Sequence, residues 1–377
     1  MSIRPDIVSR SNVRRAIADI KEYFGPDDPE FLAQRLGRPV ESIIKLDANE
    51  NPYGPSPLVQ EMLSTFNGYS IYPDSAQRTA RAALAAYAGV PADSLILGNG
   101  ADELIDLLMR AYLDPGDELI DFPPSFAMYA FNAQLQDARV VSVPRNDDFS
   151  IDVDAALAAI TPRTKLILLT SPNNPTGTVM PAADVRRILD TGYLVVLDEA
   201  YFEFADADGQ GFESMIGEVA RYPNLVVLRT FSKWAGLAGL RIGYGVFPGE
   251  VSQHLWKLKP PFNVNVAALV AMRAALEDRE HLLGTVRKIV AERNRLLVEL
   301  PKTRLLRPFP TRSNFMLCEI DGMDGRTLTD RLADEGILVR YYNTSRLRNC
   351  VRISVGRPEQ NDILLATLTR FADEIGD

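Results

Sequence analysis

The chain has 377 residues, of which 46% are hydrophobic and 24% are charged, and its formal net charge is −9. This length and composition predict a globular protein of two domains, and the acidic balance argues against nucleic acid as a partner. Two histidines and two cysteines are too few for a disulfide framework, and no HExxH pattern or cluster of ligands is present. We expect no metal site, and without a GxSxG elbow a Ser-His-Asp hydrolase is not indicated.

The N-terminal residues MSIRPDIVSRSNVRRAIADI contain scattered charges and lack the continuous apolar core of a secretory signal. No apolar run approaches the roughly 20 residues that are needed to cross a bilayer. Cys318 and Cys350 are most simply free thiols in a reducing compartment. We therefore expect a cytoplasmic protein without a membrane partner.

Between about residues 94 and 245, short apolar runs alternate with helical patterns, which predicts parallel strands joined by crossover helices. A helix over residues 101–113 begins directly after Gly98 and Gly100 and has acidic residues in its first turn. Apolar runs predict strands at residues 95–97, 165–170, 193–198 and 225–230.

The pattern changes near Pro260, and residues 266–300 read as one long amphipathic helix that connects two domains. A smaller α/β unit follows and ends in a helix from about Pro358. The predicted division is an N-terminal segment that packs with the small domain (1–45), a large domain (46–260), and the connecting helix with the small domain (261–377).

Open parallel sheets bind ligands beyond the carboxyl ends of their strands, so the residues that follow each apolar run are informative. The first run is followed by GNGADE, in which Gly100, Ala101 and Asp102 offer close backbone approach and a helix N-terminus to a phosphate. A plain strand-to-helix turn explains this motif equally well. The second run is followed by SPNNPTG, which presents the Asn174 amide at the strand end, although Asn-Pro is also common turn chemistry.

The third run is followed by DEAYFEF, which places Asp198 where the strand ends. A magnesium-binding Walker B acid would need a GxxxxGK[ST] loop elsewhere, and the chain has none. The alternative is a buried carboxylate that faces a cation. A protonated pyridine nitrogen would serve, which is what pyridoxal 5'-phosphate demands.

The fourth run leads into RTFSKWAGLAGLRIGYG, which places Lys233 among small and apolar residues. A desolvated lysine near another cation has a lowered amine pKa and can act as a nucleophile. Ser232 and Arg241 flank it with a hydroxyl and a guanidinium, which together suit a phosphate. Four strand ends therefore supply what one phosphorylated aldehyde cofactor needs.

At these residues the sequence resembles the fold-type I pyridoxal-phosphate-dependent aminotransferases over nearly the whole chain. The resemblance implies an α/β fold, with a large domain around a mostly parallel central sheet flanked by helices and a smaller α/β domain. The motifs that show it are IIKLDANENPYGPSP, GNGADELIDLL, PPSFAMY, SPNNPTGT, LDEAYFEF, TFSKWAGLAGLRIGYG, SNFML and VRISVG.

The resemblance implies that Lys233, Asp198 and Tyr201 are catalytic. Lys233 forms the Schiff base with the cofactor, and Asp198 pairs with its pyridine nitrogen. Asn174 and Tyr201 bind its phenolic oxygen, and Phe126 stacks on its ring. A homodimer with shared active sites is also implied, because one phosphate ligand comes from the neighbouring subunit. The implied phosphate ligands are the turn at Gly100, Ala101 and Asp102, the side chains of Ser232 and Arg241, and Tyr72 of the partner subunit.

For the substrate, the resemblance implies that Arg352 binds a carboxylate, which suits bidentate pairing. Arg340 and Tyr23 correspond to residues near the substrate's phosphate or distal end. Asn49 and its neighbour Glu50 belong to an N-terminal substrate segment. A departure from the family is Phe262, which stands where many members have a tyrosine whose hydroxyl reaches the substrate phosphate.

The implied reaction is a ping-pong transamination between glutamate and a phosphorylated imidazole substrate, both small molecules. Related enzymes with similar motifs act on aromatic amino acids, so an aromatic amino-acid aminotransferase is the first alternative. A threonine-phosphate decarboxylase and a non-catalytic cofactor-binding regulator are further alternatives, and the retention of Lys233 argues against the latter.

Overall fold

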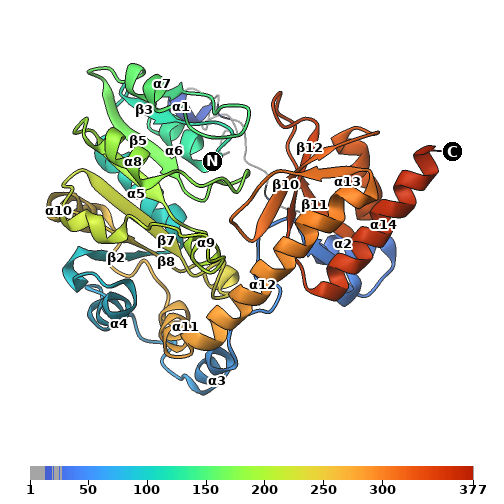
Figure 1. Cartoon of the computed structure of the whole chain (residues 1–377). Helices are drawn as coiled ribbons and strands as arrows, with labels where there is room; N and C mark the ends of the chain where they lie inside the picture. Colours follow the sequence, from blue (N-terminus) through green and yellow to red (C-terminus); the bar gives the residue numbers. More distant parts are fainter. Residues whose placement is uncertain (1–12, 19, 21–24, 26–27, 377) are drawn as a thin grey trace, which may run out of the picture.

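The computed structural model describes residues 13–18, 20, 25 and 28–376. Two lobes are visible, each built on its own sheet (Figure 1). We call residues 57–277 the large lobe, and residues 28–46 and 300–376 the small lobe; helix α12 lies between them. The predicted α/β fold, with a large mostly parallel sheet and a smaller α/β unit, is confirmed. No helix in the described ranges is both long and apolar enough to span a membrane.

The large lobe contains a seven-stranded sheet of order β2-β8-β7-β6-β5-β3-β4. Its pairs are parallel except those made by β8, and β2 and β7 share a direction because both are antiparallel to β8. The strands are β2 (Leu95–Gly98), β3 (Glu118–Asp121), β4 (Arg139–Ser142), β5 (Thr164–Thr170), β6 (Leu194–Asp198), β7 (Leu225–Thr230) and β8 (Gly243–Val246).

The strands of this sheet are buried on both faces, as their continuous apolar runs predict. In β5, Leu166 and Leu168 point to one face, whereas Ile167 and Leu169 point to the other. The first face is covered by α5 (Ala101–Tyr112), α6 (Met128–Leu135) and α10 (Gly249–Leu258). The second face is covered by α4 (Arg78–Ala88), α7 (Val153–Ala158), α8 (Ala182–Leu189) and α9 (Phe202–Asp206).

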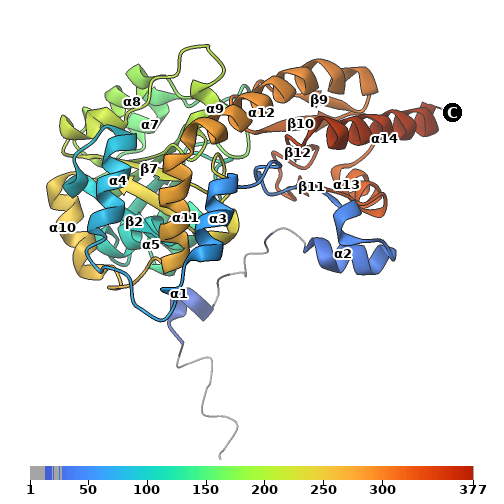
Figure 2. The same ribbon diagram turned by 90° about the horizontal axis from the view of Figure 1, so that it is seen from below.

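The single connecting helix predicted for residues 266–300 is wrong, because the chain breaks at Asp278 into α11 (Val266–Glu277) and α12 (Arg279–Glu299). Asp278 has φ −100° and ψ 32°, outside helical geometry, and aspartate favours such positions over helix interiors. Helix α11 packs beside α4 and α3 (Pro57–Thr65) in the large lobe (Figure 2), and α12 runs towards the small lobe.

The small lobe contains a five-stranded sheet of order β1-β11-β12-β10-β9. Strand β1 brings the N-terminal segment into this sheet by pairing in parallel with β11. The elements are β1 (Ile44–Leu46), β9 (Leu306–Pro308), β10 (Phe315–Ile320), β11 (Ile337–Tyr341), β12 (Cys350–Ser354), α2 (Pro29–Leu36), α13 (Gly325–Asp334) and α14 (Pro358–Gly376). Short 3-10 turns are η2 (Val40–Ser42), η3 (Ala92–Ser94), η4 (Ile216–Ala220), η5 (Ala238–Leu240) and η6 (Leu300–Thr303).

The N-terminal segment touches both lobes. Helix α2 packs within the small lobe, where Leu32 and Ala33 share one apolar cluster with Leu338. Helix α1 (Arg15–Ala18) instead lies beside α6 of the large lobe, and the Arg14 guanidinium donates to the Leu135 carbonyl at 2.9 Å. The predicted limits of 1–45, 46–260 and 261–377 for the domains stay predictions.

The carboxyl ends of β2, β5, β6 and β7 lie at one edge of the large sheet, because these strands run in the same direction. In the register, Thr170 of β5 is opposite Asp198 of β6, which is opposite Leu228 of β7. The loops that follow these strands therefore start side by side. Asn174, Asp198 and Lys233 all come from this edge.

Candidate active site

Lys233 lies in the turn that follows β7, half-buried beside the segment that enters from β1. Its Nζ donates to the Ala48 carbonyl at 2.9 Å. Burial lowers the pKa of Lys233 to about 8, and the guanidinium groups of Arg352 and Arg241 lower it as well. Lys233 therefore holds more neutral amine near pH 7 than a surface lysine does, as a nucleophile or proton acceptor requires.

Asp198 ends β6 and is 5% exposed. One carboxylate oxygen accepts from the Ala200 N–H at 2.9 Å, and the other accepts from the Tyr129 hydroxyl at 2.7 Å. Burial raises the pKa of Asp198 to about 6. Among the described residues no lysine or arginine forms an ion pair with it. The carboxylate is thus fixed in place and suited to a cationic ligand.

Tyr129, on α6, is a site residue that the sequence reasoning missed. It is fully buried, donates to Asp198 and accepts from the Thr170 hydroxyl at 3.0 Å. Burial raises the pKa of Tyr129 well above its usual range, so its hydroxyl remains a donor. The available signal was its place one helical turn after Phe126, whose ring it meets edge-on at 5.5 Å.

Gly100 and Arg241 pack against each other at the start of α5. Gly100 has φ 79°, and a Cβ atom there would lie 2.5 Å from Nη2 of Arg241, so only glycine fits. Arg241 itself has φ 56°, and Nη2 donates to Asp102 at 2.8 Å. This turn brings a guanidinium to the N-terminus of α5.

Ser232, two residues after the end of β7, adds a hydroxyl whose Oγ accepts from the Thr230 hydroxyl at 2.9 Å. The first N–H groups of α5, at Ala101 and Asp102, have no partner within the helix because they open it. A helix N-terminus with a nearby guanidinium is a favourable environment for a phosphate group.

Arg352, on β12 of the small lobe, reaches the large lobe. It donates to the Asn174 side-chain oxygen at 2.6 Å and to the Asp47 carbonyl at 2.5 Å. Its Nε is buried and has no hydrogen-bond partner within the described part of the chain. Arg340 is directly opposite Arg352 on β11, with its guanidinium 5.8 Å from the Tyr342 ring centroid. Two arginines on facing positions favour an anion between or beside them.

Asn49 links the two lobes. Its side-chain amide donates to the Tyr201 hydroxyl at 3.0 Å, and its oxygen accepts from the Ser354 hydroxyl at 3.1 Å. Burial raises the pKa of Tyr201, so its hydroxyl is protonated. Both polar ends of Asn49 are therefore committed within the chain. Glu50, the next residue, accepts from Lys45 at 2.8 Å.

Tyr72 and Phe262 stack on each other, with ring centroids 4.4 Å apart. Tyr72 is 77% exposed and Phe262 is 43% exposed, so both rings face outwards from the single chain. Phe126 is half-buried next to Tyr129. Tyr23, a predicted substrate residue, lies outside the described residues.

The arrangement fits a phosphorylated aldehyde that has a basic ring nitrogen. Lys233 offers an amine with a lowered pKa, Asp198 offers a buried carboxylate in need of a cation, and Arg241 stands at a helix end that suits an anion. A doubly covered, mostly parallel sheet with these groups at its carboxyl edge indicates an enzyme that works through amine and aldehyde chemistry.

Comparison with known proteins identifies the family. The chain belongs to the aminotransferase class I and II family, whose model matches residues 41–368. The family that the sequence motifs indicate is thereby confirmed, and the protein is an aminotransferase.

Several relatives are similar over most of their length. A histidinol-phosphate aminotransferase of Roseiflexus castenholzii is 49% identical over 369 residues, covering 96% of this chain and 98% of the relative. Histidinol-phosphate aminotransferase 1, chloroplastic, of Arabidopsis thaliana is 48% identical over 344 residues, covering 91% and 81%. The crystal structure of histidinol-phosphate aminotransferase from Sinorhizobium meliloti in complex with pyridoxal-5'-phosphate superposes with a TM-score of 0.86 at 29% identity, covering 97% and 98%.

Proposed function

We propose that this aminotransferase uses pyridoxal 5'-phosphate to transfer the amino group of glutamate to imidazole acetol phosphate, giving histidinol phosphate and 2-oxoglutarate in histidine biosynthesis. The observation that carries the proposal is the 49% identity over 96% of the chain to a histidinol-phosphate aminotransferase. The chemistry of the residues at the carboxyl edge of the large sheet supports the cofactor.

When bound, pyridoxal 5'-phosphate supplies an aldehyde that condenses with amines and a ring that withdraws electrons from the neighbouring Cα. In this proposal Lys233 binds the aldehyde carbon, Asp198 pairs with the ring nitrogen, and Phe126 covers the ring. Asn174 and Tyr201 donate to the phenolic oxygen. The phosphate is held by the turn at Gly100, Ala101 and Asp102, by Ser232 and Arg241, and by Tyr72 of the partner subunit.

Lys233 is also the proposed proton carrier, once the amine of the donor has replaced it on the aldehyde carbon and its Nζ is a free amine again. Its Nζ, with a pKa of about 8, can accept a proton from the donor's Cα and return it later in the cycle. Asp198 stabilises a positive charge in front of it, and that charge in turn keeps the carboxylate ionised. The donors from Tyr129 and Ala200 hold Asp198 in one orientation throughout.

The substrate groups are divided between the arginines of the small lobe. Arg352 binds the carboxylate of glutamate, because its Nε is a buried donor in need of an acceptor. Histidinol phosphate has no carboxylate, so its phosphate is assigned to Arg340 together with Tyr23. Asn49 and Glu50 complete the substrate segment, in which Asn49 orients Tyr201.

A homodimer and a cytoplasmic location are part of the same proposal. The exposed apolar side chains of Tyr69, Ile71, Tyr72 and Phe262 support a subunit interface near Tyr72. The buried free thiols of Cys318 and Cys350 suit a reducing compartment.

A substrate panel tests the proposal. The purified protein should absorb in the visible through cofactor bonded to Lys233, and it should prefer histidinol phosphate over phenylalanine, tyrosine and threonine phosphate with 2-oxoglutarate as acceptor. Lys233→Ala should lose both the visible band and turnover. A preference for phenylalanine or tyrosine would overturn the proposed substrate but leave the transamination reaction in place. A protein that takes up no cofactor would refute the proposal as a whole.

A further inference from the structure

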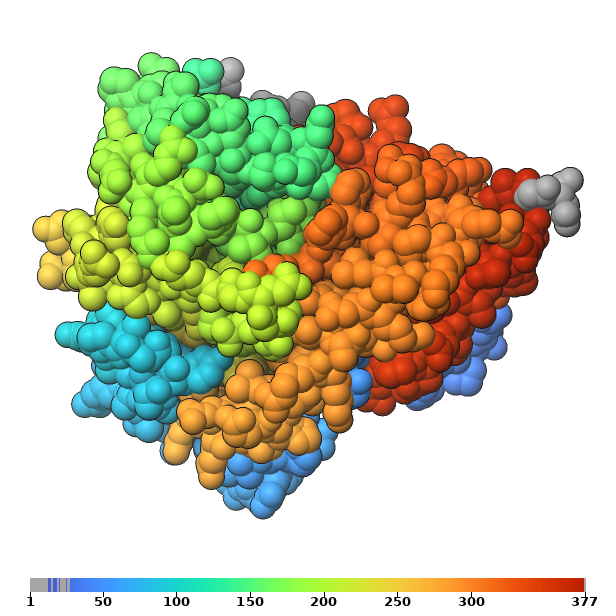
Figure 3. All heavy atoms as spheres, in the orientation of Figure 1, coloured from blue at the N-terminus to red at the C-terminus, as the bar shows by residue number. Residues whose placement is uncertain are grey.

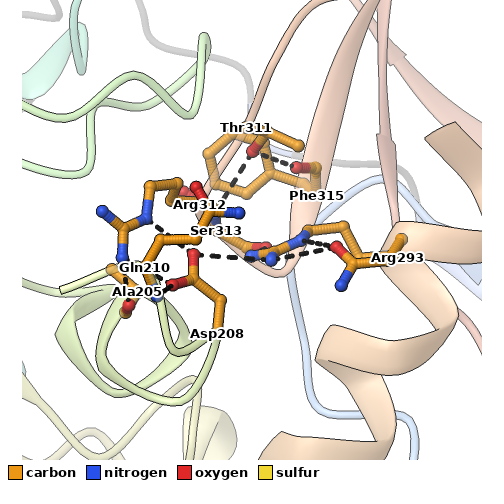
Figure 4. Close-up of polar contacts among 9 residues, drawn as sticks. Ala205, Asp208, Gln210, Arg293, Thr311, Arg312, Ser313 and Phe315 are labelled. Atoms are coloured by element: carbon orange, nitrogen blue, oxygen red, sulfur yellow. Dashed lines mark hydrogen bonds and ion pairs between the residues drawn. The ribbon is translucent and has the colours of Figure 1, made fainter. Parts of the chain in front are cut away.

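A second buried carboxylate, Asp208, lies outside the proposed cofactor site, two residues beyond α9. Its side chain is fully buried. The Arg312 guanidinium donates two hydrogen bonds of 2.6 Å to it, one to each carboxylate oxygen (Figure 4). The Arg293 guanidinium, also buried, lies 3.6 Å from the same carboxylate. One buried acid thus faces two cations, of which Arg293 is buried and Arg312 is partly exposed.

This cluster joins the two lobes. Asp208 belongs to the large lobe, Arg312 precedes β10 in the small lobe, and Arg293 lies on α12. In the space-filling view the yellow-green segment after α9 meets the orange segment of α12 (Figure 3). Arg312 also donates to the Ala205 carbonyl at 2.6 Å, so it holds the end of α9 as well as Asp208.

The same segment of the small lobe is fixed to a second large-lobe loop. The backbone N–H of Arg312 donates to the Gly177 carbonyl at 2.9 Å. A Cβ atom on Gly177 would lie 1.9 Å from the Thr311 hydroxyl, so the two loops are packed at closest approach. Gly177 belongs to SPNNPTG, the loop that presents Asn174.

The segment leads directly into the strand that supports Arg352. Two residues after Arg312, Asn314 donates to the Asn49 carbonyl at 2.9 Å. In the pairing of β10 with β12, Leu317 is opposite Arg352. Arg352 and Asn174, which are 2.6 Å apart, therefore belong to two segments that the contacts of Arg312 hold together: the β10–β12 pair and the SPNNPTG loop.

The form of the contact suits alignment better than stability. A two-pronged guanidinium–carboxylate pair fixes orientation as well as distance. A buried ion pair often contributes little net stability, because desolvation offsets the attraction. Alignment of substrate groups, in contrast, responds to displacements of about 1 Å.

We propose that Asp208 and Arg312, supported by Arg293, are positioning residues that hold the small lobe in register with the Asn174 loop and so align Arg352 for the carboxylate of the amino donor. The inference rests on the proposed function for the identity of that donor, glutamate. The cluster itself touches neither cofactor nor substrate.

The test compares Asp208→Asn and Arg312→Lys with Asp154→Asn in the full-length holoenzyme. Asp154 is the control because its 2.6 Å pair with Arg187 is exposed and lies within the large lobe. Three quantities are measured: bound cofactor by absorbance, the KM for glutamate and for histidinol phosphate, and hydrogen exchange of the Arg312 backbone amide with and without cofactor.

We expect Asp208→Asn to raise the glutamate KM about tenfold and to speed exchange at Arg312, with bound cofactor and the Asp154→Asn control unchanged. Arg312→Lys keeps the charge but loses the bidentate contact. It should raise the glutamate KM about threefold and also speed exchange at residue 312. This variant provides the test if Asp208→Asn does not fold. Faster exchange with an unchanged glutamate KM, or equal changes in the control, would overturn the proposal.

The design separates this inference from the proposed function. If the wild-type enzyme rejects histidinol phosphate, the substrate proposal fails, but a dicarboxylate such as glutarate still reports on Arg352 through the cofactor absorbance. Weaker glutarate binding in Asp208→Asn and Arg312→Lys then supports the alignment role. Unchanged binding overturns it.

Discussion

Asp198 and Asp208 are ten residues apart on either side of α9, and both carboxylates are buried, but their surroundings are opposite. Asp198 receives hydrogen bonds only from neutral donors, the Tyr129 hydroxyl and the Ala200 N–H. Asp208 faces the guanidinium groups of Arg312 and Arg293. Asp198 lacks a countercharge within the described chain, whereas Asp208 has two.

The difference separates a ligand site from a structural contact. A buried carboxylate without a cation is unfavourable, and the cost appears in the raised pKa of Asp198, about 6. Such a cost is offset when a bound ligand brings the missing positive charge. The charge of Asp208 is neutralised by arginines of its own chain, so a cationic ligand would gain little by binding there. The unbalanced charge, rather than burial alone, marks the place where chemistry is expected.

Substitution of Asp198 should have the largest effect. We expect Asp198→Asn to lower kcat/KM about 10³-fold, because a preorganised charge at the cofactor is lost.

In the cofactor-free protein, the charged form of Asp198 should instead lower the stability of the fold. A folded pKa of about 6 against a usual 3.8 means that the group's contribution to stability is full below about pH 3.8 and is lost as the pH rises through about 6, at a cost of about 3 kcal/mol.

Unfolding of the cofactor-free wild type and Asp198→Asn at pH 5 and pH 8 measures this term. The variant should gain stability over the wild type between the two values, since the amide has no charge to desolvate. A difference that is independent of pH, or a variant that retains more than about a tenth of the activity, would contradict the role of Asp198 as an uncompensated charge.

Substitution of Asp208 should destabilise the fold. Asp208→Asn leaves the buried Arg293 guanidinium and the partly buried Arg312 guanidinium without a countercharge, and we expect a loss of about 3 kcal/mol in the free energy of unfolding at pH 7.5. The exposed pair of Asp154 and Arg187 is the control, and Asp154→Asn should change the free energy by less than about 0.5 kcal/mol. Equal losses in the two variants would remove the distinction between the buried and the exposed pair.

The edge of the large sheet could be predicted from the sequence, because each apolar run ends in a polar loop. The runs at β5, β6 and β7 predict strands, and parallel strands bring their carboxyl ends together, which is why Asn174, Asp198 and Lys233 meet at one edge. Their roles towards cofactor and substrate stay predictions. The helix break at Asp278 was missed because the helical patterns before and after the polar run at residues 277–281 were read as one helix.

The Asp208 cluster could not be predicted, because it depends on contacts between residues about 100 positions apart in loops without any periodicity. Arg293 lies on a helix, but nothing in its spacing indicates a partner in the other lobe. The link from Asn49 to Tyr201 depends likewise on a crossing of the lobes that only the fold produces. Of these residues, Tyr129 was the easiest to predict, because it follows Phe126 by three residues in the motif PPSFAMY.

Substitution of Tyr129 should have the smallest effect of the series. The Tyr129 hydrogen bond lowers the pKa of Asp198, so Tyr129→Phe should raise that pKa above about 6 and weaken the charge at the cofactor. We expect kcat/KM to fall about tenfold, the size of one hydrogen bond to a charged group. Tyr193→Phe is the matched control, since its hydroxyl bonds the Thr161 carbonyl at the opposite end of β6. If both variants lose the same activity, the hydroxyl of Tyr129 does not act through Asp198; if only Tyr129→Phe does, the neutral donors around Asp198 are part of what prepares it for a cation.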